Sequence, residues 1–279
     1  MKNLKKISLA LLIFSIFSCS ETNVTREESG ELESATAPAI AGLFKKRVLI
    51  EDYTGTWCGN CAVVSYAIEK VYENPNNASV TVAIHSGNDP YNFLDVAPLH
   101  AYIFGSLTTV TLPEARLNRN IVWKDQDTNL LDPINLRSNN CGLGLAIQSK
   151  LIDSNISLDV KMKFAQNYSG LKLVVYLLED KLYYKQTNYS NYFNAINPIQ
   201  NFEHNHVLRK TLTNILGDNI TETIADGTII NKNFTIAVPA NIANAYNIGI
   251  VAFITDQNNT VINVRGASIN QNQLFEENL

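Results

Sequence analysis

The chain has 279 residues, of which 46% are hydrophobic, and a net charge of −4 at pH 7. This acidity argues against nucleic-acid binding, because a nucleic-acid-binding protein normally presents a basic surface to the phosphates. The length and the apolar content suit two modest domains, each with its own core, better than one.

The N-terminus has the pattern of a signal peptide, which we expect to span residues 1–18. Three lysines precede an apolar run from Ile7 to Phe17. A helix needs about 20 residues to cross a bilayer, so this run is too short for a transmembrane segment. The motif Ile-Phe-Ser-Cys at 16–19 resembles a bacterial lipobox, in which Cys19 would be lipidated and would hold the protein to a membrane. The alternative is ordinary secretion in which Cys19 has no special role.

The next segment is polar and rich in Glu and Thr, and it lacks apolar periodicity. We therefore expect residues 19–43 to be the lipidated cysteine and a flexible tether. From residue 44 to 138 strand and helix patterns alternate, which favours an α/β fold. The expected strands are 47–53, 79–85 and 115–118, and the expected helices are 61–72, 98–104 and, less regular, 127–138.

A Cys-x-x-Cys motif lies between the first expected strand and the first expected helix, where Trp57-Cys58-Gly59-Asn60-Cys61 connects them. At a helix N-terminus, unpaired N–H groups and the positive end of the helix dipole stabilise a thiolate. We therefore expect Cys58 to be the nucleophile and Cys61 the resolving thiol. The alternatives are a permanent structural disulfide and a metal site.

A zinc site would need two ligands in addition to the two cysteines of the motif. The candidates are His85, Cys141, His204 and His206. Nothing in their spacing requires them to converge, so we expect neither a metal nor a cofactor. Cys141 is better explained as a buried, inert thiol near a domain junction.

From residue 139 to 279 the patterns are almost all those of strands. Residues 156–164 alternate apolar and polar side chains at a strict period of two, as in a strand with one buried face. We expect an all-β, immunoglobulin-like antiparallel sandwich. The aromatic, Asn-rich connection 183–193 would bind a protein or glycan ligand, pack over an end of the sandwich, or cover the loop of the Cys-x-x-Cys motif. The expected strands are 143–151, 156–164, 171–178, 207–216, 228–238, 248–255 and 260–269.

Residues 53–61 resemble the active-site segment of thioredoxin, with Asn60 in place of its proline. The resemblance implies a thioredoxin-like domain over 44–138, in which Trp57, Gly59 and Asn60 form the active-site loop.

The same resemblance implies roles for two residues outside the motif. Asp52 falls where thioredoxins carry a buried acid beneath the second cysteine, and Pro113 falls where they have a cis-proline beside the disulfide. Glu51 is a second candidate for the acid, and Asp52 would have no such role if its side chain faced outward.

Three segments, 53–61, Leu117-Asn118-Arg119 and His-Asn-His-Val-Leu-Arg at 204–209, together resemble the Bacteroidetes lipoproteins related to the 28 kDa outer membrane protein. This resemblance spans most of the mature chain. It implies a signal peptide, outer-membrane attachment, a thioredoxin-like domain and an appended β domain.

Two functions follow as hypotheses. The first is a thiol-disulfide oxidoreductase of the cell envelope, anchored at the outer membrane through Cys19 and acting on protein thiols or disulfides. In it Cys58 attacks, Cys61 resolves and Asp52 exchanges a proton. The second is a non-enzymatic outer-membrane lipoprotein for binding or assembly, in which the 58–61 pair is structural and the β domain binds a protein or glycan.

Overall fold

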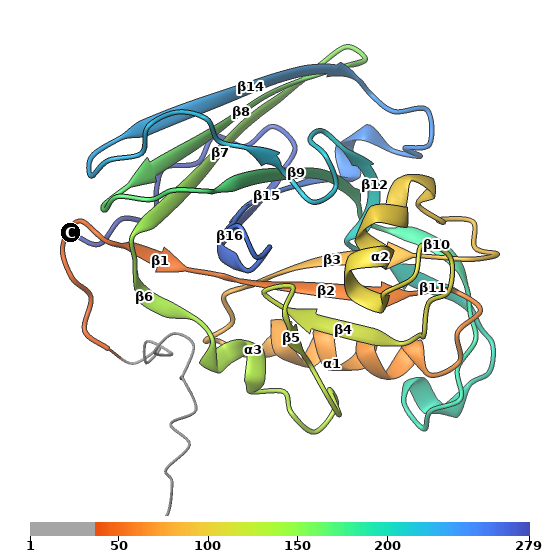
Figure 1. The fold of residues 1–279 in the computed structure, drawn as a ribbon. Coiled ribbons are helices and arrows are strands. Elements are labelled where there is room, and N and C mark those ends of the chain that lie inside the picture. Colours follow the sequence, from red (N-terminus) through yellow and green to blue (C-terminus); the bar gives the residue numbers. More distant parts are fainter. Residues whose placement is uncertain (1–36) are drawn as a thin grey trace, which may run out of the picture. The chain divides into compact units, whose positions relative to one another are not determined.

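A nine-stranded mixed β-sheet runs through the structure, a computed structural model that describes residues 37–279. Its strands are β2 (Val48–Thr54), β3 (Ser79–His85), β4 (Glu114–Leu117), β5 (Ile121–Val122), β9 (Lys172–Glu179), β12 (Val207–Thr211), β13 (Asp218–Asn219), β15 (Ile248–Thr255) and β16 (Val261–Ser268). They lie in the order β16-β15-β9-β12-β3-β2-β4-β5, with β13 paired to β9 (Figure 1). The signal peptide, Cys19 and most of the expected tether lie outside the described residues.

The middle of this sheet joins the two halves of the chain. β2 pairs with β3 in parallel, and β3 pairs in parallel with β12 through Ala83 and Val207. β12 then pairs antiparallel with β9. All seven residues of β3 are buried, as expected for a parallel strand covered on both faces.

This sheet overturns the expected fold class, an α/β thioredoxin-like domain followed by an immunoglobulin-like antiparallel sandwich. Strands from both sides of residue 139 belong to one mixed sheet, and β12, from the expected sandwich, lies directly beside β3. The period and the turn residues of a strand identify the strand but leave its partner open. The expectation of two domains with separate sheets is therefore wrong.

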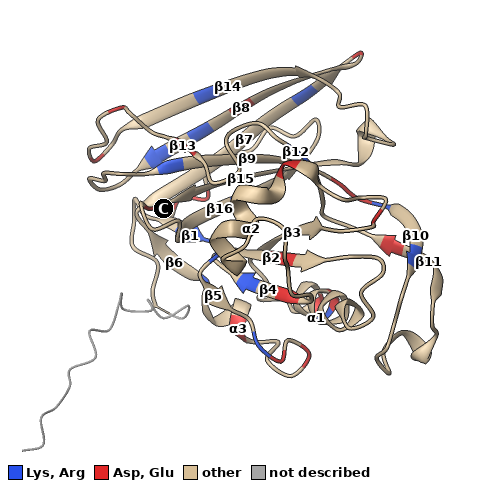
Figure 2. Cartoon of the chain, turned by 45° about the vertical axis from the view of Figure 1, so that its right-hand side comes forward, with Lys and Arg blue, Asp and Glu red and all other residues tan. Residues whose placement is uncertain are grey.

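A three-stranded antiparallel sheet packs on one part of the large sheet. Its strands are β7 (Leu143–Ile152), β8 (Asn155–Phe164) and β14 (Ile229–Ala237), in the order β14-β8-β7. Buried side chains of β7 and β8 form a core with those of β9 and β15. The strict alternation expected for 156–164 is confirmed, with Lys161 and Lys163 on the less buried face of β8. Figure 2 marks the basic residues along β8 and β14 in blue.

Two smaller pairs of strands complete the β structure. β1 (Phe44–Lys46) pairs with β6 (Ser138–Cys141), and β10 (Leu182–Gln186) pairs with β11 (Ile199–His204), both antiparallel. The three 3-10 helices are Leu94–Val96, Phe193–Ala195 and Ala245–Asn247.

The α-helices cover both faces of the β2–β3 part of the large sheet. Helix α1 (Cys61–Glu73) packs its apolar stripe, which includes Val64 and Ile68, against Ile50. On the other face Leu99 of α2 (Ala97–Phe104) belongs to the core that contains Tyr53. The third helix, α3 (Asp132–Asn135), is short. Within residues 37–279 no helix has the length and apolar character needed to span a membrane.

Candidate functional site

The two cysteines of the motif form a disulfide at the point where β2 leads into α1. The Cα atoms of Cys58 and Cys61 are 5.4 Å apart. The N–H of Cys58 donates to the Gly55 carbonyl at 3.0 Å, and the N–H of Cys61 donates to the Cys58 carbonyl at 3.2 Å. Cys61 is the first residue of α1, so Cys58 lies in the turn that precedes the helix, not in its first turn.

The disulfide is almost closed to solvent, because Cys58 is 6% exposed and Cys61 is fully buried. The chain segment 186–189, which starts at the last residue of β10, covers it. Nε2 of Gln186 donates to the Cys58 carbonyl at 3.0 Å. The N–H of Thr187 donates to the Thr56 carbonyl at 2.9 Å, and the N–H of Tyr189 donates to the Gly59 carbonyl at 2.9 Å. We call residues 186–189 the cover segment.

The glycine of the motif is required by the cover segment. A Cβ atom at position 59 would lie 2.2 Å from Cδ2 of Tyr189, so only glycine lets the ring lie against the loop. The neighbouring Tyr192 stacks on Tyr66 of α1 with ring centroids 3.8 Å apart, and its hydroxyl donates to Asp127. The residues after β10 are therefore fixed to both the loop and the helix.

The other side of the loop is held by residues 85–89. Nε1 of Trp57 donates to the Ser86 carbonyl at 2.8 Å, although the Trp57 side chain is 48% exposed. Oδ2 of Asp89 accepts from the N–H of Thr56 at 2.6 Å and lies 3.0 Å from Nδ1 of His85. His85 thus positions the loop through Asp89.

Asp52 and Glu51 are both buried, but they lie on opposite faces of β2 because side chains alternate along a strand. Asp52 is on the α1 face, its Oδ1 has no hydrogen-bond partner, and burial raises its pKa to about 7. Glu51 is on the other face, where its Oε1 lies 2.7 Å from Nη2 of Arg119 in a fully buried ion pair. Of the two candidate acids, Asp52 alone lies on the side of the sheet where the disulfide-bearing helix packs.

A cavity of about 250 Å³ reaches Asp52 between α1 and the β10–β11 hairpin. Ser65 of α1 and His204 at the end of β11 line it as well. His204 is 5% exposed and its Nε2 has no hydrogen-bond partner. Burial, with the neighbouring His85 as a second cause, lowers the pKa of His204 to about 4, so its imidazole is neutral at pH 7. His204 therefore adds no positive charge to the cavity beside Asp52 at pH 7.

Pro113 lies at the same end of the sheet as the disulfide loop. Its peptide bond with Leu112 is cis, and the next residue, Glu114, pairs with Tyr53 of β2. A role of Pro113 toward a substrate stays a prediction. The segment Leu117-Asn118-Arg119 is structural, since Oδ1 of Asn118 accepts from the N–H of Leu49 and Arg119 holds Glu51.

The alternative zinc ligands do not converge on the cysteines. No three His, Cys, Asp or Glu side chains within residues 37–279 form a group that could hold a metal ion. Cys141 is buried in β6, with its Sγ 3.9 Å from the Ile262 carbonyl. Nδ1 of His206 lies 3.4 Å from Asp180.

The sequence places Cys58, Cys61 and Asp52 near one another, and it offers the connection 183–193 as one possible cover of their loop, without a role for Gln186 or Tyr189 individually. They lie about 130 residues further along the chain, so no local pattern connects them to the cysteines. The signal in the sequence is the long aromatic connection 183–193, and of its expected roles the cover of the loop is the one that the contacts of Gln186 and Tyr189 support.

Comparison with known proteins connects this chain to proteins of the outer membrane. The family described as outer membrane protein Omp28 matches residues 104–273. HBP35 of Porphyromonas gingivalis has a similar structure, with a TM-score of 0.61 and 17% identity over 83% of this chain and 78% of that one. A domain of the outer membrane lipoprotein Omp28 from Porphyromonas gingivalis matches 48% of this chain and 92% of its own length, with 24% identity and a TM-score of 0.33. No curated protein matches the chain.

The family match covers more than half of the 279 residues and includes the cover segment that closes the disulfide. The likeness to HBP35 shows a shared fold that extends over both halves of the chain. The chain therefore belongs to the Omp28 outer membrane protein family, whose place is the cell envelope.

Proposed function

We propose that this protein carries out thiol-disulfide exchange at Cys58 and Cys61, held to the outer membrane by lipid on Cys19. The observation that carries the proposal is the buried, unpartnered carboxyl of Asp52 on the face of β2 that α1 covers, where α1 begins with Cys61. An ionisable group without a partner is costly to bury, and such groups concentrate at functional sites.

The exchange begins with the reduced pair. The Cys58 thiolate attacks one sulfur of a client disulfide, which forms a mixed disulfide and releases the first client thiolate. Asp52 accepts the proton of the Cys61 thiol, and the Cys61 sulfur then attacks the Cys58 sulfur. The second client thiolate leaves, so the client is reduced by two electrons and the pair is oxidised to the Cys58–Cys61 disulfide. A carboxyl with a pKa of about 7 suits this proton transfer near neutral pH.

The test is the reduction potential of the Cys58–Cys61 pair in the full chain, measured by equilibration with glutathione. A value between about −120 and −270 mV supports exchange, since the known dithiol oxidoreductases lie in this range. A value well below about −300 mV is typical of structural disulfides and would contradict the proposal.

One observation favours the second candidate, a non-enzymatic outer-membrane lipoprotein with a structural disulfide. The two cysteines are 6% and 0% exposed and the cover segment bonds to their loop, so a client disulfide could not reach the sulfurs without movement of that segment. For this second function, exposed aromatic side chains would contact a protein or glycan partner. Tyr183 in β10 and Tyr189 after it are two such side chains.

A further inference from the structure

A second pocket, of about 210 Å³, lies beyond the end of α1 that is remote from the disulfide. Three segments form its walls: residues 45–47 of β1 and the turn into β2, residues 75–78 after α1, and residues 137–139 at the start of β6. The pocket shares no residue with the cavity at Asp52. An inference from it is therefore independent of the proposed exchange chemistry.

Backbone pairing holds the three walls in place. Lys46 of β1 lies opposite Ser138 of β6 in the antiparallel ladder. The N–H of Val48 donates to the Ala78 carbonyl at 3.1 Å, which fixes the segment after α1 against the start of β2. The pocket is thus built by paired strands and a bonded turn, and it does not depend on long side chains for its shape.

The pocket carries an excess of positive charge. Glu276 is its one acidic lining residue, and its basic lining residues are Lys45, Lys46, Arg47 and Arg137. This composition is unusual for a chain whose net charge is −4.

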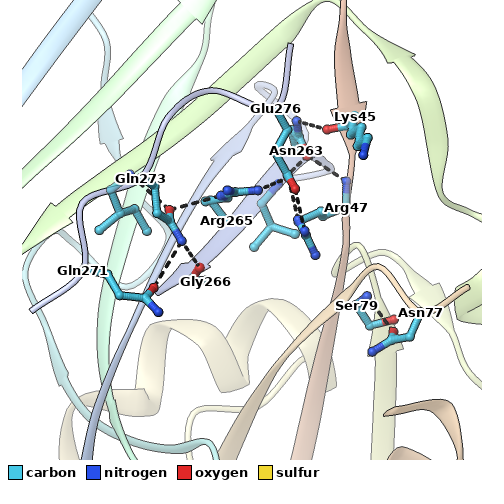
Figure 3. A network of polar contacts seen from close by, with 12 residues as sticks. Lys45, Arg47, Asn77, Ser79, Asn263, Arg265, Gly266, Gln271, Gln273 and Glu276 are labelled. Atoms are coloured by element: carbon cyan, nitrogen blue, oxygen red, sulfur yellow. Dashed lines mark hydrogen bonds and ion pairs between the residues drawn. The ribbon is translucent and has the colours of Figure 1, made fainter. Parts of the chain in front are cut away.

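The single carboxylate is already engaged by two guanidinium groups. Oε2 and Oε1 of Glu276 accept from Nε and Nη2 of Arg47 at 2.7 and 2.6 Å. Glu276 also forms an ion pair with Arg265, which lies on its other side (Figure 3). Burial and the nearby charge of Arg47 lower the pKa of Arg265 to about 10, which reflects the crowding of cations here. Glu276 therefore leaves the other basic side chains of the pocket without a counter-charge.

Among residues 37–279 the remaining cations have no acidic partner. In the described part of the chain no carboxylate lies within 4.0 Å of a charged nitrogen of Lys45, Lys46 or Arg137. Nε of Arg137 is buried and has no hydrogen-bond acceptor. A buried charged donor without an acceptor is costly, so the pocket lacks the oxygen atoms that its donors require.

We propose that this pocket binds a phosphate group, supplied either by inorganic phosphate or by the headgroup of a phospholipid. A phosphate offers several acceptor oxygens to the fork of a guanidinium and to ammonium groups. The pocket is smaller than the about 300–1,000 Å³ typical of sites for drug-sized molecules, and this suits a single polar group.

The position of the pocket gives a reason to test lipid as a source. Asn139 lines the pocket, and its Nδ2 donates to the Ala37 carbonyl at 3.2 Å. Nδ2 of the next residue, Asn140, donates to the Pro38 carbonyl at 2.8 Å. The pocket therefore lies beside Ala37 and Pro38, the first residues that the structure describes.

The first experiment titrates the full mature chain with inorganic phosphate in a calorimeter, in a buffer free of other oxyanions. We expect saturable binding of phosphate, and we expect the affinity to be about tenfold weaker in Arg137→Gln and in Lys46→Gln. A tenfold change corresponds to the loss of about 1.4 kcal/mol of binding free energy for each charged contact. The matched control is Lys150→Gln, which removes the charge of an exposed lysine on β7 and should leave the affinity unchanged. Thermal unfolding of each variant shows that it is folded, and Lys46→Gln keeps the test decisive should Arg137→Gln unfold.

The second experiment distinguishes the two sources of phosphate by flotation with vesicles, using a Cys19→Ser chain so that lipidation does not contribute. A lipid source predicts binding to phosphatidylglycerol vesicles over phosphatidylcholine vesicles, loss in Arg137→Gln and competition by inorganic phosphate. A soluble source predicts saturation in the calorimeter and equal, weak binding to both vesicles. The proposal is overturned if neither ligand binds, or if Lys150→Gln weakens binding as much as the pocket variants do.

Discussion

Two adjacent residues of β2 show how the position of a carboxylate decides its chemistry. Glu51 is neutralised by Arg119 in a buried ion pair, and such pairs hold a fold together only while both partners remain. Asp52 is buried without a partner, and its pKa is about 7. The face of the strand, not the type of side chain, separates a structural acid from a candidate proton acceptor.

The raised pKa of Asp52 predicts how stability depends on pH. Because the folded-state pKa lies above the unfolded value, the native state binds a proton that the unfolded state releases as pH rises from about 4 to about 7. The free energy of unfolding should therefore fall across this range. Asp52→Asn should remove the fall and stabilise the oxidised protein at pH 8 by up to about 4 kcal/mol.

Urea unfolding of both proteins at pH 4, 6 and 8 measures this difference. In the reduced protein the same variant should slow disulfide exchange by about 100-fold above pH 7, where Asp52 would otherwise be ionised to accept the Cys61 proton. A variant that matches the native protein in stability at every pH would show that Asp52 is not buried as described.

At the scale of elements, the cover segment after β10 and the loop that bears the disulfide form one assembly. Their connection consists of four backbone or amide hydrogen bonds and the Tyr189 ring against Gly59. The Tyr189 side chain is exposed, whereas Gln186 is buried together with its bond to the loop. Access to the sulfurs therefore requires a local opening of the cover segment that also releases the buried Gln186 amide.

Removal of the Tyr189 ring should uncover the disulfide. We expect Tyr189→Ala to be reduced by dithiothreitol about fivefold faster than the native protein, the effect of losing about 1 kcal/mol of contact. Tyr183→Ala is the matched control, because Tyr183 is an exposed tyrosine of β10 that contacts Glu203 and not the loop. Alkylation of samples taken at intervals, followed by mass spectrometry, gives both rates, and equal acceleration in the two variants would show that the ring does not protect the disulfide.

The sequence predicts the local elements of this fold because neighbouring residues determine them. The apolar stripe of α1 and the alternation of β8 are both present where the periodicities predict them. The β10 strand was missed, since its burial pattern, with three exposed residues in succession, has no period of two. The site was predicted in part for the same reason: Asp52 and the cysteines are close in sequence, whereas Gln186 is brought to them by the whole fold.

For the whole molecule, the important feature is that β3 lies between β2 and β12. A chain that ends at Ser138 would expose the edge of β3 and lose the core side chains that β9, β12 and β15 contribute. We expect this truncated chain not to fold cooperatively, which circular dichroism and thermal unfolding can show. A sharp unfolding transition in the truncated chain would mean that residues 44–138 are a domain in their own right.

Attachment to the outer membrane gives a second prediction at this scale. If Cys19 carries lipid, Cys19→Ser should move the protein from the membrane fraction to the soluble fraction, or leave the precursor uncleaved. Fractionation of cells followed by immunoblotting measures this partition, with a Cys141→Ser variant as the control for loss of a thiol elsewhere. A correctly processed Cys19→Ser protein that remains in the membrane fraction would contradict the lipidation proposal.

The parallel pairing of Ala83 with Val207 also sets an order of events during biogenesis. An exported chain emerges from its N-terminus, so β2, β3 and both cysteines of the motif leave the translocon long before β12 and the cover segment. Contacts between residues so distant in sequence form slowly, because a long loop must close first. The cysteines are thus open to the oxidants of the envelope during this interval, and their oxidation state at the time of closure is the state in which the finished protein begins its work.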